Sequence, residues 1–229
     1  MDEILHWLTR NLADVPENDD WLSDRERDVL AGMRFAKRRN DWRLGRWTAK
    51  QAICAYQVRD DSLMSSLEIR AAADGVPEAF WDGAPGKVSI SISHSNDRSL
   101  CVVGPPDFAV GCDMEQVEPR EDNFVQDYFT PEEISFTRQA PAAERSMAVN
   151  LIWSAKEATL KALREGLRRD TRSILIRPGF WGQGSAWNTW TGNCLESSRI
   201  FYGWWRACDG YIYTMAADQP TSAPERLWI

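Results

Sequence analysis

The chain has 229 residues, 43% of them hydrophobic and 27% charged, which is enough for one large core or two of ordinary size. Its net charge of −7 excludes bulk attraction to nucleic acid or to an anionic membrane, and no apolar run approaches the about 18 residues of a membrane span. Five cysteines without a C-x-x-C pair, and an acidic start without a signal-peptide pattern, predict a reduced, cytoplasmic protein. Only two histidines are present, which argues against a histidine-rich zinc site.

A basic helix is predicted over residues 35–56, after a shorter helix that begins with the capping pair Ser23 and Glu26. Its basic side chains recur every three or four residues and share one face: Arg39, Arg43, Arg46 and Lys50. Guanidinium groups match phosphate oxygens, so this stripe indicates an anion site. An ordinary solvated helix face is the alternative.

A β-hairpin is predicted over residues 88–103, because Val88, Ile90 and Ile92 alternate with serines before a turn at residues 96–98. The hairpin brings His94 and Ser95 to a strand end, where both could bind a phosphate, although a histidine in a turn needs no ligand. A third strand follows at residues 108–115. Three strands in succession predict one antiparallel sheet.

That third strand carries Asp113 and Glu115 two positions apart, so both side chains point to the same side, roughly 7 Å apart. Two such like charges repel unless a cation lies between them, and carboxylate oxygens suit Mg²⁺. A solvated edge strand that happens to carry two acids is the alternative.

The C-terminal part begins with a helix capped by Thr130, with Pro131 at its first position and Glu133 completing a capping box. A long helix is predicted from Pro141 to Gly166. Its polar face carries Trp153, Glu157 and Lys161, for which a surface ion pair is the alternative explanation. Strands follow at residues 173–176, 198–207 and 211–217, the last two joined by an Asp-Gly turn.

Four segments together resemble a known family. Residues 110–115 resemble its (V/I)-G-(I/V)-D-(I/V/L)-E box, and residues 153–162 resemble its W-x-x-K-E-A-x-x-K-A box. Residues 91–95 match an upstream S-x-S-H-S element, and Gly45, Arg46 and Ala49 resemble a G-R-x-A-A box. Their order and spacing are similar to those of the 4'-phosphopantetheinyl transferase superfamily, in its long, surfactin-synthetase-activating type.

The resemblance implies an α+β fold: a pseudodimer of two similar subdomains, each a small antiparallel sheet packed with a long helix. We expect an N-terminal half over residues 1–107, on the coenzyme A 3'-phosphate and adenine side, and a C-terminal half over residues 108–229, on the metal and catalytic side. The implied reaction transfers 4'-phosphopantetheine from coenzyme A to a serine of an acyl or peptidyl carrier protein and releases 3',5'-ADP. The partners would be coenzyme A and an apo carrier, and the chain a monomer without nucleic acid or membrane.

The family's metal site maps onto Asp113, Glu115 and Glu157, which would bind Mg²⁺. Lys161 would lie on the pyrophosphate and stabilise the leaving group. Lys156 would orient the same side of the site. The resemblance leaves the general base open between Glu157, Glu133 and a metal-bound water.

The remaining implied contacts are to coenzyme A. Ser93 and His94 would contact its phosphates, with His94 on the 3'-phosphate. The basic helix would add Arg38, Arg39 and Arg46, and the sequence does not settle which of them binds the 3'-phosphate. Gly75 and Pro77 resemble the family's G-x-P turn near the adenine, but its middle residue, often a lysine, is Val76 here.

Two other functions would also use parts of this sequence. A non-catalytic module that binds coenzyme A or a carrier protein is the first, but the complete set of acids and Lys161 disfavours it. An RNA-binding protein that uses the arginine stripe is the second, and the acidic net charge disfavours it. The sequence does not distinguish carriers of fatty acid synthesis from those of polyketide or peptide secondary metabolism, Mg²⁺ from Mn²⁺, or coenzyme A from its acyl derivatives.

Overall fold

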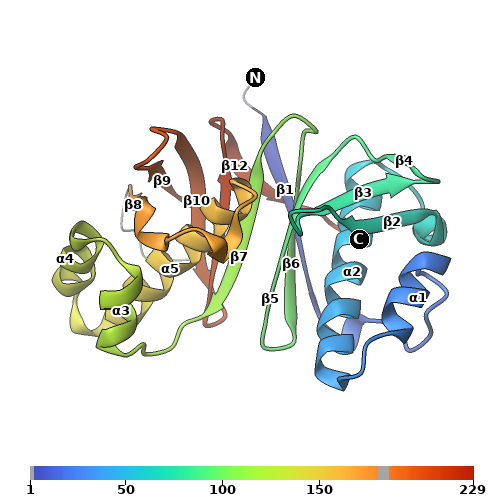
Figure 1. Ribbon diagram of the computed structural model, residues 1–229, viewed down its shortest axis with the longest axis horizontal. Helices are drawn as coiled ribbons and strands as arrows, with labels where there is room; N and C mark the ends of the chain where they lie inside the picture. Colours follow the sequence, from blue (N-terminus) through green and yellow to red (C-terminus); the bar gives the residue numbers. More distant parts are fainter. Residues whose placement is uncertain (1–2, 180–185) are drawn as a thin grey trace. The chain divides into compact units, whose positions relative to one another are not determined.

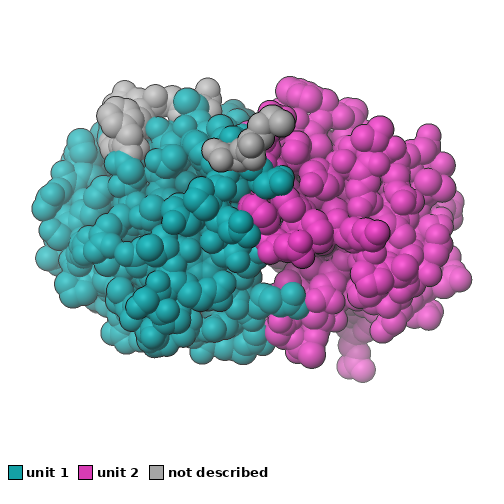
Figure 2. All heavy atoms as spheres, turned by 90° about the horizontal axis from the view of Figure 1, so that it is seen from above, with its two compact units in different colours: residues 1–3, 109–223 teal, residues 4–108, 224–229 magenta. Residues whose placement is uncertain are grey.

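The computed structural model describes residues 3–179 and 186–229. Its Cα positions divide into two compact units, shown in different colours in Figure 2. Unit 1 comprises residues 1–3 and 109–223, and unit 2 comprises residues 4–108 and 224–229. The chain therefore passes from one unit to the other at three points, between residues 3 and 4, 108 and 109, and 223 and 224. Each unit contains helices packed on antiparallel strands, so the α+β class predicted from the sequence is confirmed.

Unit 2 is built around one long helix and two small sheets (Figure 1). The helix α2 packs against β1 and β6, and its buried face includes Ala49 and Ile53. One sheet has the order β12-β1-β6-β5, and the other has the order β2-β3-β4. The elements in chain order are β1 (Ile4–Asn11), α1 (Asp24–Ala31), α2 (Ala36–Tyr56), β2 (Leu67–Ala71), β3 (Pro77–Trp81), β4 (Ala84–Pro85), β5 (Ser89–Ser95), β6 (Arg98–Gly104) and the late strand β12 (Ser222–Arg226).

Unit 1 has a five-stranded sheet of order β7-β11-β10-β9-β8, with helix α5 packed on β7 and β11. Helix α5 is buried on nearly all sides, so it forms the centre of this unit's core. The elements in chain order are β7 (Val110–Gln116), α3 (Asp122–Tyr128), α4 (Pro131–Gln139), α5 (Arg145–Ala162), β8 (Ile174–Pro178), β9 (Asn188–Cys194), β10 (Ile200–Cys208) and β11 (Tyr211–Ala217).

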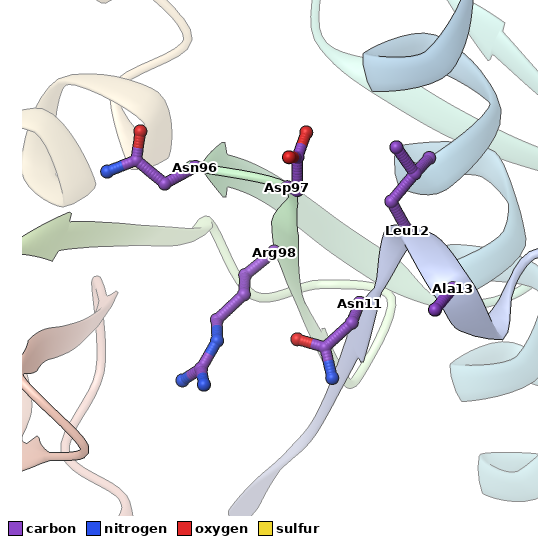
Figure 3. A pocket seen from close by; sticks show the side chains of 6 residues that line it. All are labelled: Asn11, Leu12, Ala13, Asn96, Asp97 and Arg98. Carbon is purple, nitrogen blue, oxygen red and sulfur yellow. The ribbon is translucent and has the colours of Figure 1, made fainter.

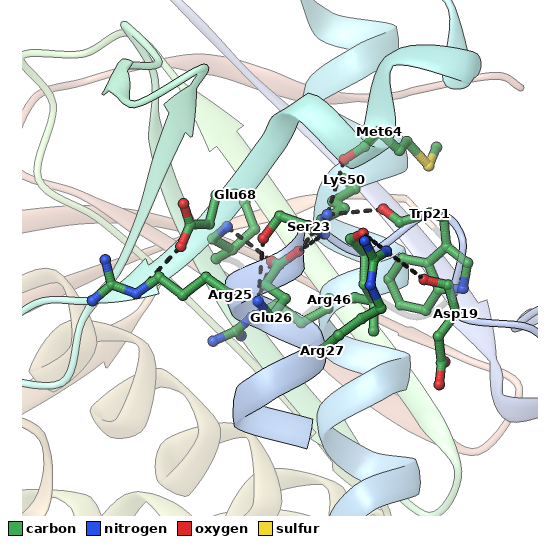
Figure 4. A network of polar contacts seen from close by, with 12 residues as sticks. Asp19, Trp21, Ser23, Arg25, Glu26, Arg27, Arg46, Lys50, Met64 and Glu68 are labelled. Carbon is green, nitrogen blue, oxygen red and sulfur yellow. Dashed lines mark hydrogen bonds and ion pairs between the residues drawn. The ribbon is translucent and has the colours of Figure 1, made fainter. Parts of the chain in front are cut away.

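A buried ion pair joins helix α2 to the start of α1 in unit 2 (Figure 4). Ser23 caps α1 and Glu26 completes the capping box, as predicted. The carboxylate of Glu26 also makes contacts inside the unit: it lies 2.5 Å from the ammonium of Lys50 and accepts a hydrogen bond from the backbone N–H of Ile69. Lys50 also donates to the carbonyls of Trp21 and Met64, and its side chain has no exposed surface.

Unit 1 contains the same arrangement. Thr130 and Glu133 form the predicted capping box of α4, and the carboxylate of Glu133 lies 2.9 Å from the ammonium of Lys156. Glu133 also accepts the backbone N–H of Ile176, and 43 residues separate these two, as they separate Glu26 from Ile69. In each unit, therefore, one glutamate ties the first turn of a short helix to the long helix and to a strand.

Two expectations differ from the structure. The long helix spans Arg145–Ala162 rather than residues 141–166, because a 3-10 turn precedes it and Arg164 adopts a left-handed φ of 61° just after it. Strand β7 does not join the β5–β6 hairpin; it pairs with β11, with Asp113 opposite Thr214. The alternation of side chains identifies a strand but not a partner about a hundred residues away. The predicted Asp209-Gly210 hairpin is confirmed between β10 and β11.

Within residues 3–179 and 186–229, no helix combines the length and the apolar character needed to cross a bilayer.

Candidate functional site

The candidate site of unit 1 lies where α5 crosses the face of β7 that carries Gly111, Asp113 and Glu115. A Cβ atom on Gly111 would lie 1.9 Å from the carbonyl oxygen of Ala158, so only glycine allows so close an approach of strand and helix. The same strand face then directs Asp113 and Glu115 toward α5, which carries Glu157. One local contact thus brings two acids of a strand to a third acid about forty residues later.

Lys161 lies between the first and the last of these acids. Its ammonium is 2.8 Å from Asp113 Oδ1 and 3.9 Å from Glu157 Oε2, and it donates to the carbonyl of Cys112. Asp113 is buried, whereas the side chains of Glu157 and Lys161 are 19% and 28% exposed. Solvent and ligands can therefore reach the carboxylate and the ammonium from α5.

Glu115 is held from two sides. Arg120 donates to its Oε2 at 2.9 Å and the indole N–H of Trp153 donates to its Oε1 at 3.0 Å. Burial, followed by the charge of Asp113, raises the pKa of Glu115 to about 7. Glu157 contributes to the same shift, so all three acids share one electrostatic environment.

The charges of this cluster fit a divalent cation. Burial and the charge of Asp113 also raise the pKa of Glu157. For Lys161, burial acts to lower the pKa, but the charge of Asp113 and its neighbours outweighs burial and raises it. The three acids exceed their two basic partners, Lys161 and Arg120, by one negative charge when all are ionised.

In the described part of the chain, no three His, Cys, Asp or Glu side chains are already grouped closely enough to hold a metal ion. Lys161 lies within 4 Å of both Asp113 and Glu157, where its ammonium partly neutralises them. Oxygen donors with excess negative charge are the ligands that Mg²⁺ takes in proteins. The carboxylates of the cluster are therefore suited to bind Mg²⁺. In this structure the ammonium of Lys161 supplies positive charge beside two of them.

Lys156 and Glu133 form a separate, buried ion pair. Neither side chain has exposed surface, and Lys156 donates to Glu133 and to the carbonyls of Thr171 and Ile174. Glu133 accepts from Thr130 N, Ile176 N and Lys156. Both residues, predicted as a coenzyme A contact and as a candidate base, are thus engaged inside the protein.

Unit 2 brings two predicted phosphate ligands together in a hollow of about 450 Å³. The exposed side chains of Arg38 and His94 line it with the aromatic rings of Phe35 and Trp42, and with Lys37, whose ammonium is paired with Asp41 in the same lining. Arg38 comes from the first turn of α2 and His94 from the end of β5. Positive charge and aromatic surface in one hollow suit a phosphorylated nucleotide.

The other predicted residues of unit 2 are placed differently. Arg39 donates to the carbonyl of Leu30, and Arg46 lies over the ring of Trp42 and 3.9 Å from Glu26. Ser93 is buried within β5. Gly75 and Pro77 form the turn into β3, in which Gly75 has a φ of 88°.

A second hollow of unit 2, of about 500 Å³, lies between the end of β1 and the β5–β6 turn (Figure 3). Asn11, Asn96, Asp97 and Arg98 line it with Leu12 and Ala13. The backbone N–H of Leu12 donates to the carbonyl of Asp97, which closes the turn onto the strand. None of the residues predicted for the site lines this hollow.

Sequence analysis missed Arg120, which contacts Glu115 and also donates to Asn150 of α5. Arg120 follows Pro119 in a loop, so no helix or strand period marks it. The one available signal is a lone basic residue within the acidic stretch of residues 115–122.

Comparison with known proteins connects this geometry to a family. Residues 109–214 match the model of the 4'-phosphopantetheinyl transferase superfamily, and this range contains both β7 and α5. The 4'-phosphopantetheinyl transferase HetI of Nostoc sp. strain PCC 7120 is 30% identical over 81 residues, which cover 34% of each protein. The chain thus spans about a third of the length of this curated relative. The match to the 4'-phosphopantetheinyl transferase superfamily thus covers residues 109–214, slightly less than half of the chain, and it contains the acidic cluster with Lys161.

Proposed function

We propose that this protein transfers the 4'-phosphopantetheine group of coenzyme A to a serine hydroxyl of an acyl or peptidyl carrier protein and releases 3',5'-ADP. The observation that supports the proposal most strongly is that Lys161 lies within 4 Å of Asp113 and Glu157, while the charges of both acids raise the pKa of Glu115. The superfamily match covers all four residues. The relative's name, a 4'-phosphopantetheinyl transferase, agrees with the reaction.

Asp113, Glu115 and Glu157 are the residues that would hold Mg²⁺. When bound there, the ion would neutralise charge on the diphosphate of coenzyme A and make its phosphorus easier to attack. The buried carboxylate of Asp113 and the partly exposed one of Glu157 present oxygens from two different elements. A diphosphate of high negative charge is the kind of ligand for which such a site is suited.

The transfer forms a bond between the serine oxygen and the phosphorus that carries pantetheine, and it breaks the bond from that phosphorus to 3',5'-ADP. We assign the serine proton to Glu157, because its side chain is reachable whereas both oxygens of Glu133 are engaged in the protein interior. Lys161, already close to Asp113, would stabilise the negative charge that develops on the departing phosphate.

In unit 2, we propose that Arg38 and His94 contact a phosphate of coenzyme A, because both line the same basic, aromatic hollow. Gly75, Pro77 and Ser93 stay predicted contacts. We leave three residues out of the proposed set: Lys156, because its side chain has no exposed surface; Arg39, because it donates to the carbonyl of Leu30; and Arg46, because it lies over the ring of Trp42 and 3.9 Å from Glu26.

We also infer that the two units are copies of one α+β subdomain, as expected of a pseudodimer. The support is the repeated order of elements and the repeated ion pair, in which Lys50 corresponds to Lys156. By that correspondence Gln51 takes the place of Glu157. The hairpin registers likewise place Arg10 where unit 1 has Glu115, so unit 2 does not repeat the acidic cluster.

The test is incubation of the full chain with coenzyme A, Mg²⁺ and a panel of apo carrier proteins, followed by intact-mass measurement of each carrier. We expect at least one carrier to gain the mass of one phosphopantetheine group on its serine, and 3',5'-ADP to appear in equal amount. A serine-to-alanine carrier is the matched control. Tight binding of coenzyme A without any modified carrier would favour a non-catalytic binding module instead.

A further inference from the structure

Arg120 forms an ion pair with Glu115. Its terminal nitrogen donates to Glu115 Oε2 at 2.9 Å, and its Nε donates to Asn150 Oδ1 at 3.1 Å. The guanidinium also lies over the ring of Phe124 and 3.5 Å from Glu118. Contacts on several sides fix the orientation of this planar fork, so Arg120 is not a freely moving surface arginine.

Asn150 anchors the arrangement to helix α5. Its amide nitrogen donates to the carbonyl of Glu118 at 2.7 Å and to that of Ser146 at 2.8 Å, and its side chain is buried. The loop after β7 is therefore fastened to α5 through Asn150, and Arg120 extends from that loop back to Glu115. Trp153, one turn further along α5, holds the other oxygen of Glu115.

The two donors leave Glu115 with a fixed direction but with further lone pairs on both oxygens. A carboxylate that is held by hydrogen bonds loses less freedom when it binds a cation than a mobile one does. The positive charge of Arg120 acts in the opposite direction, because it repels a cation nearby. Arg120 makes two directed hydrogen bonds and is packed against a ring, which favours orientation as its main contribution.

We propose that Arg120 is a positioning residue for the divalent-cation site, which acts through Glu115. The proposal rests on the proposed function, since it concerns the same acidic cluster. Replacing Arg120 should release Glu115 to several side-chain rotamers and weaken the cluster's hold on the ion.

The probe is Mn²⁺, whose binding to the full chain is followed by electron paramagnetic resonance of the free ion. We expect Arg120→Ala to raise the dissociation constant of Mn²⁺ by about tenfold or more, as removal of outer-shell partners commonly does. Arg120→Lys keeps the charge but cannot contact Glu115 and Asn150 with one fork, so an intermediate constant is expected. Trp153→Phe, which removes the other donor to Glu115, should act in the same direction.

The matched control is Arg145→Ala. Arg145 lies in the same unit, pairs with the exposed Asp122 and has a side chain that is 50% exposed. Its loss removes one positive charge without touching Glu115, so the Mn²⁺ constant should stay near that of the wild type. The melting temperature of each variant without metal reports whether the fold is retained.

A second readout separates positioning from general damage. For Arg120→Ala, the Mg²⁺ concentration for half-maximal transfer should rise, and saturating Mg²⁺ should restore most of the rate. An Arg120→Ala variant that binds Mn²⁺ as tightly as the wild type, or more tightly, would overturn the proposal and show that charge repulsion dominates. A wild-type chain that holds no Mn²⁺ would overturn it as well. A chain that shows the expected Arg120 dependence but modifies no carrier would sustain this proposal and overturn the proposed transfer.

Discussion

At the scale of single residues, the acidic cluster combines features that folding alone does not favour. Asp113 is buried beside two other acids, and burial raises the pKa of both Glu115 and Glu157. Clusters of like charge in which the pKa is shifted are typical of functional sites. Lys161 and Arg120 offset part of the repulsion between the three acids. The cluster is therefore compatible with the fold although it keeps a net negative charge when all groups are ionised.

We predict that Asp113→Ala and Glu157→Ala each reduce the rate of transfer at least about a hundredfold, since each removes a cation ligand and Glu157 is also the assigned base. The measurement is the initial rate of carrier modification at fixed Mg²⁺ and coenzyme A. Circular dichroism should show that both variants remain folded.

The control for these variants is Glu132→Ala. Glu132 lies on the exposed surface of α4, where it pairs with Arg177, and takes no part in the cluster. Its rate should stay close to that of the wild type. Near-normal transfer by either of the other two variants would remove the corresponding residue from the site.

From the sequence alone, the basic face of the helix over residues 35–56 could be either an anion site or an ordinary solvated face. The helix and its basic face are correct, but Arg39, Arg43 and Lys50 donate to backbone carbonyls of unit 2. Loops that end near a helix leave carbonyls in need of donors, and the sequence does not indicate whether a given arginine faces a loop or the solvent. Arg38 and His94, which the resemblance assigned separately to the phosphates of coenzyme A, lie at the ends of their elements and line one hollow.

At the scale of elements, the site depends on the approach of α5 to β7. Gly111 provides the space, and small residues of α5, Ala158 and Ala162, face it. Ser154 adds a hydrogen-bonded contact of 2.8 Å with Thr214 of β11, the residue paired with Asp113. The position of Asp113 therefore depends both on the pairing of β7 with β11 and on the packing of α5 against these strands.

We predict that Gly111→Ala destabilises the protein by about 1–3 kcal/mol or more and abolishes the predicted transfer, because its Cβ meets the backbone of α5 and cannot be accommodated by a side-chain rotation. Urea unfolding measures the first effect, and the carrier assay measures the second.

Gly45→Ala is the matched comparison within a helix. A Cβ on Gly45 would lie 3.5 Å from the side chain of Ile92, an ordinary contact, and alanine favours the helix over glycine by about 0.5–1 kcal/mol. The free energy of unfolding should therefore be unchanged or higher. Equal losses in both variants would show that the close approach at Gly111 is not what sets the cost.

Local signals predicted where the elements begin, but not which of them pair. The capping boxes at Ser23 and Thr130 and the hairpin at Asp209 depend on neighbours in sequence, which a reader of the sequence sees directly. The pairing of β7 with β11 depends on contacts across about a hundred residues. For the same reason the family's boxes, rather than any periodicity, indicated that Glu157 belongs with Asp113.

At the scale of the whole molecule, two units each contain their own core and their own buried lysine–glutamate pair. Burying such a pair costs desolvation energy that its attraction only partly offsets, so its value lies in holding elements in one arrangement. In each unit it holds a short helix, a long helix and a strand.

We predict that Lys50→Met and Lys156→Met each lower the free energy of unfolding by about 3–5 kcal/mol, because each leaves a buried glutamate without its cation. Urea unfolding of the full chain measures the change. Lys37→Met is the control: Lys37 pairs with Asp41 at the surface with a side chain that is 87% exposed, and its loss should cost under about 1 kcal/mol. A loss of similar size in all three variants would contradict the distinction.

The approach of Gly111 to α5 also determines where the protein can move. The backbone amides of β7 that bond to β11, and those in the middle of α5, are enclosed between a strand pair and a helix core, and such amides exchange with deuterium only when a large part of a protein opens. We expect these amides to be among the slowest to exchange, and those that follow β7 near Arg120 to exchange faster. We then expect the loops and the long side chains, rather than the backbone that carries the acids, to move when the proposed carrier protein binds.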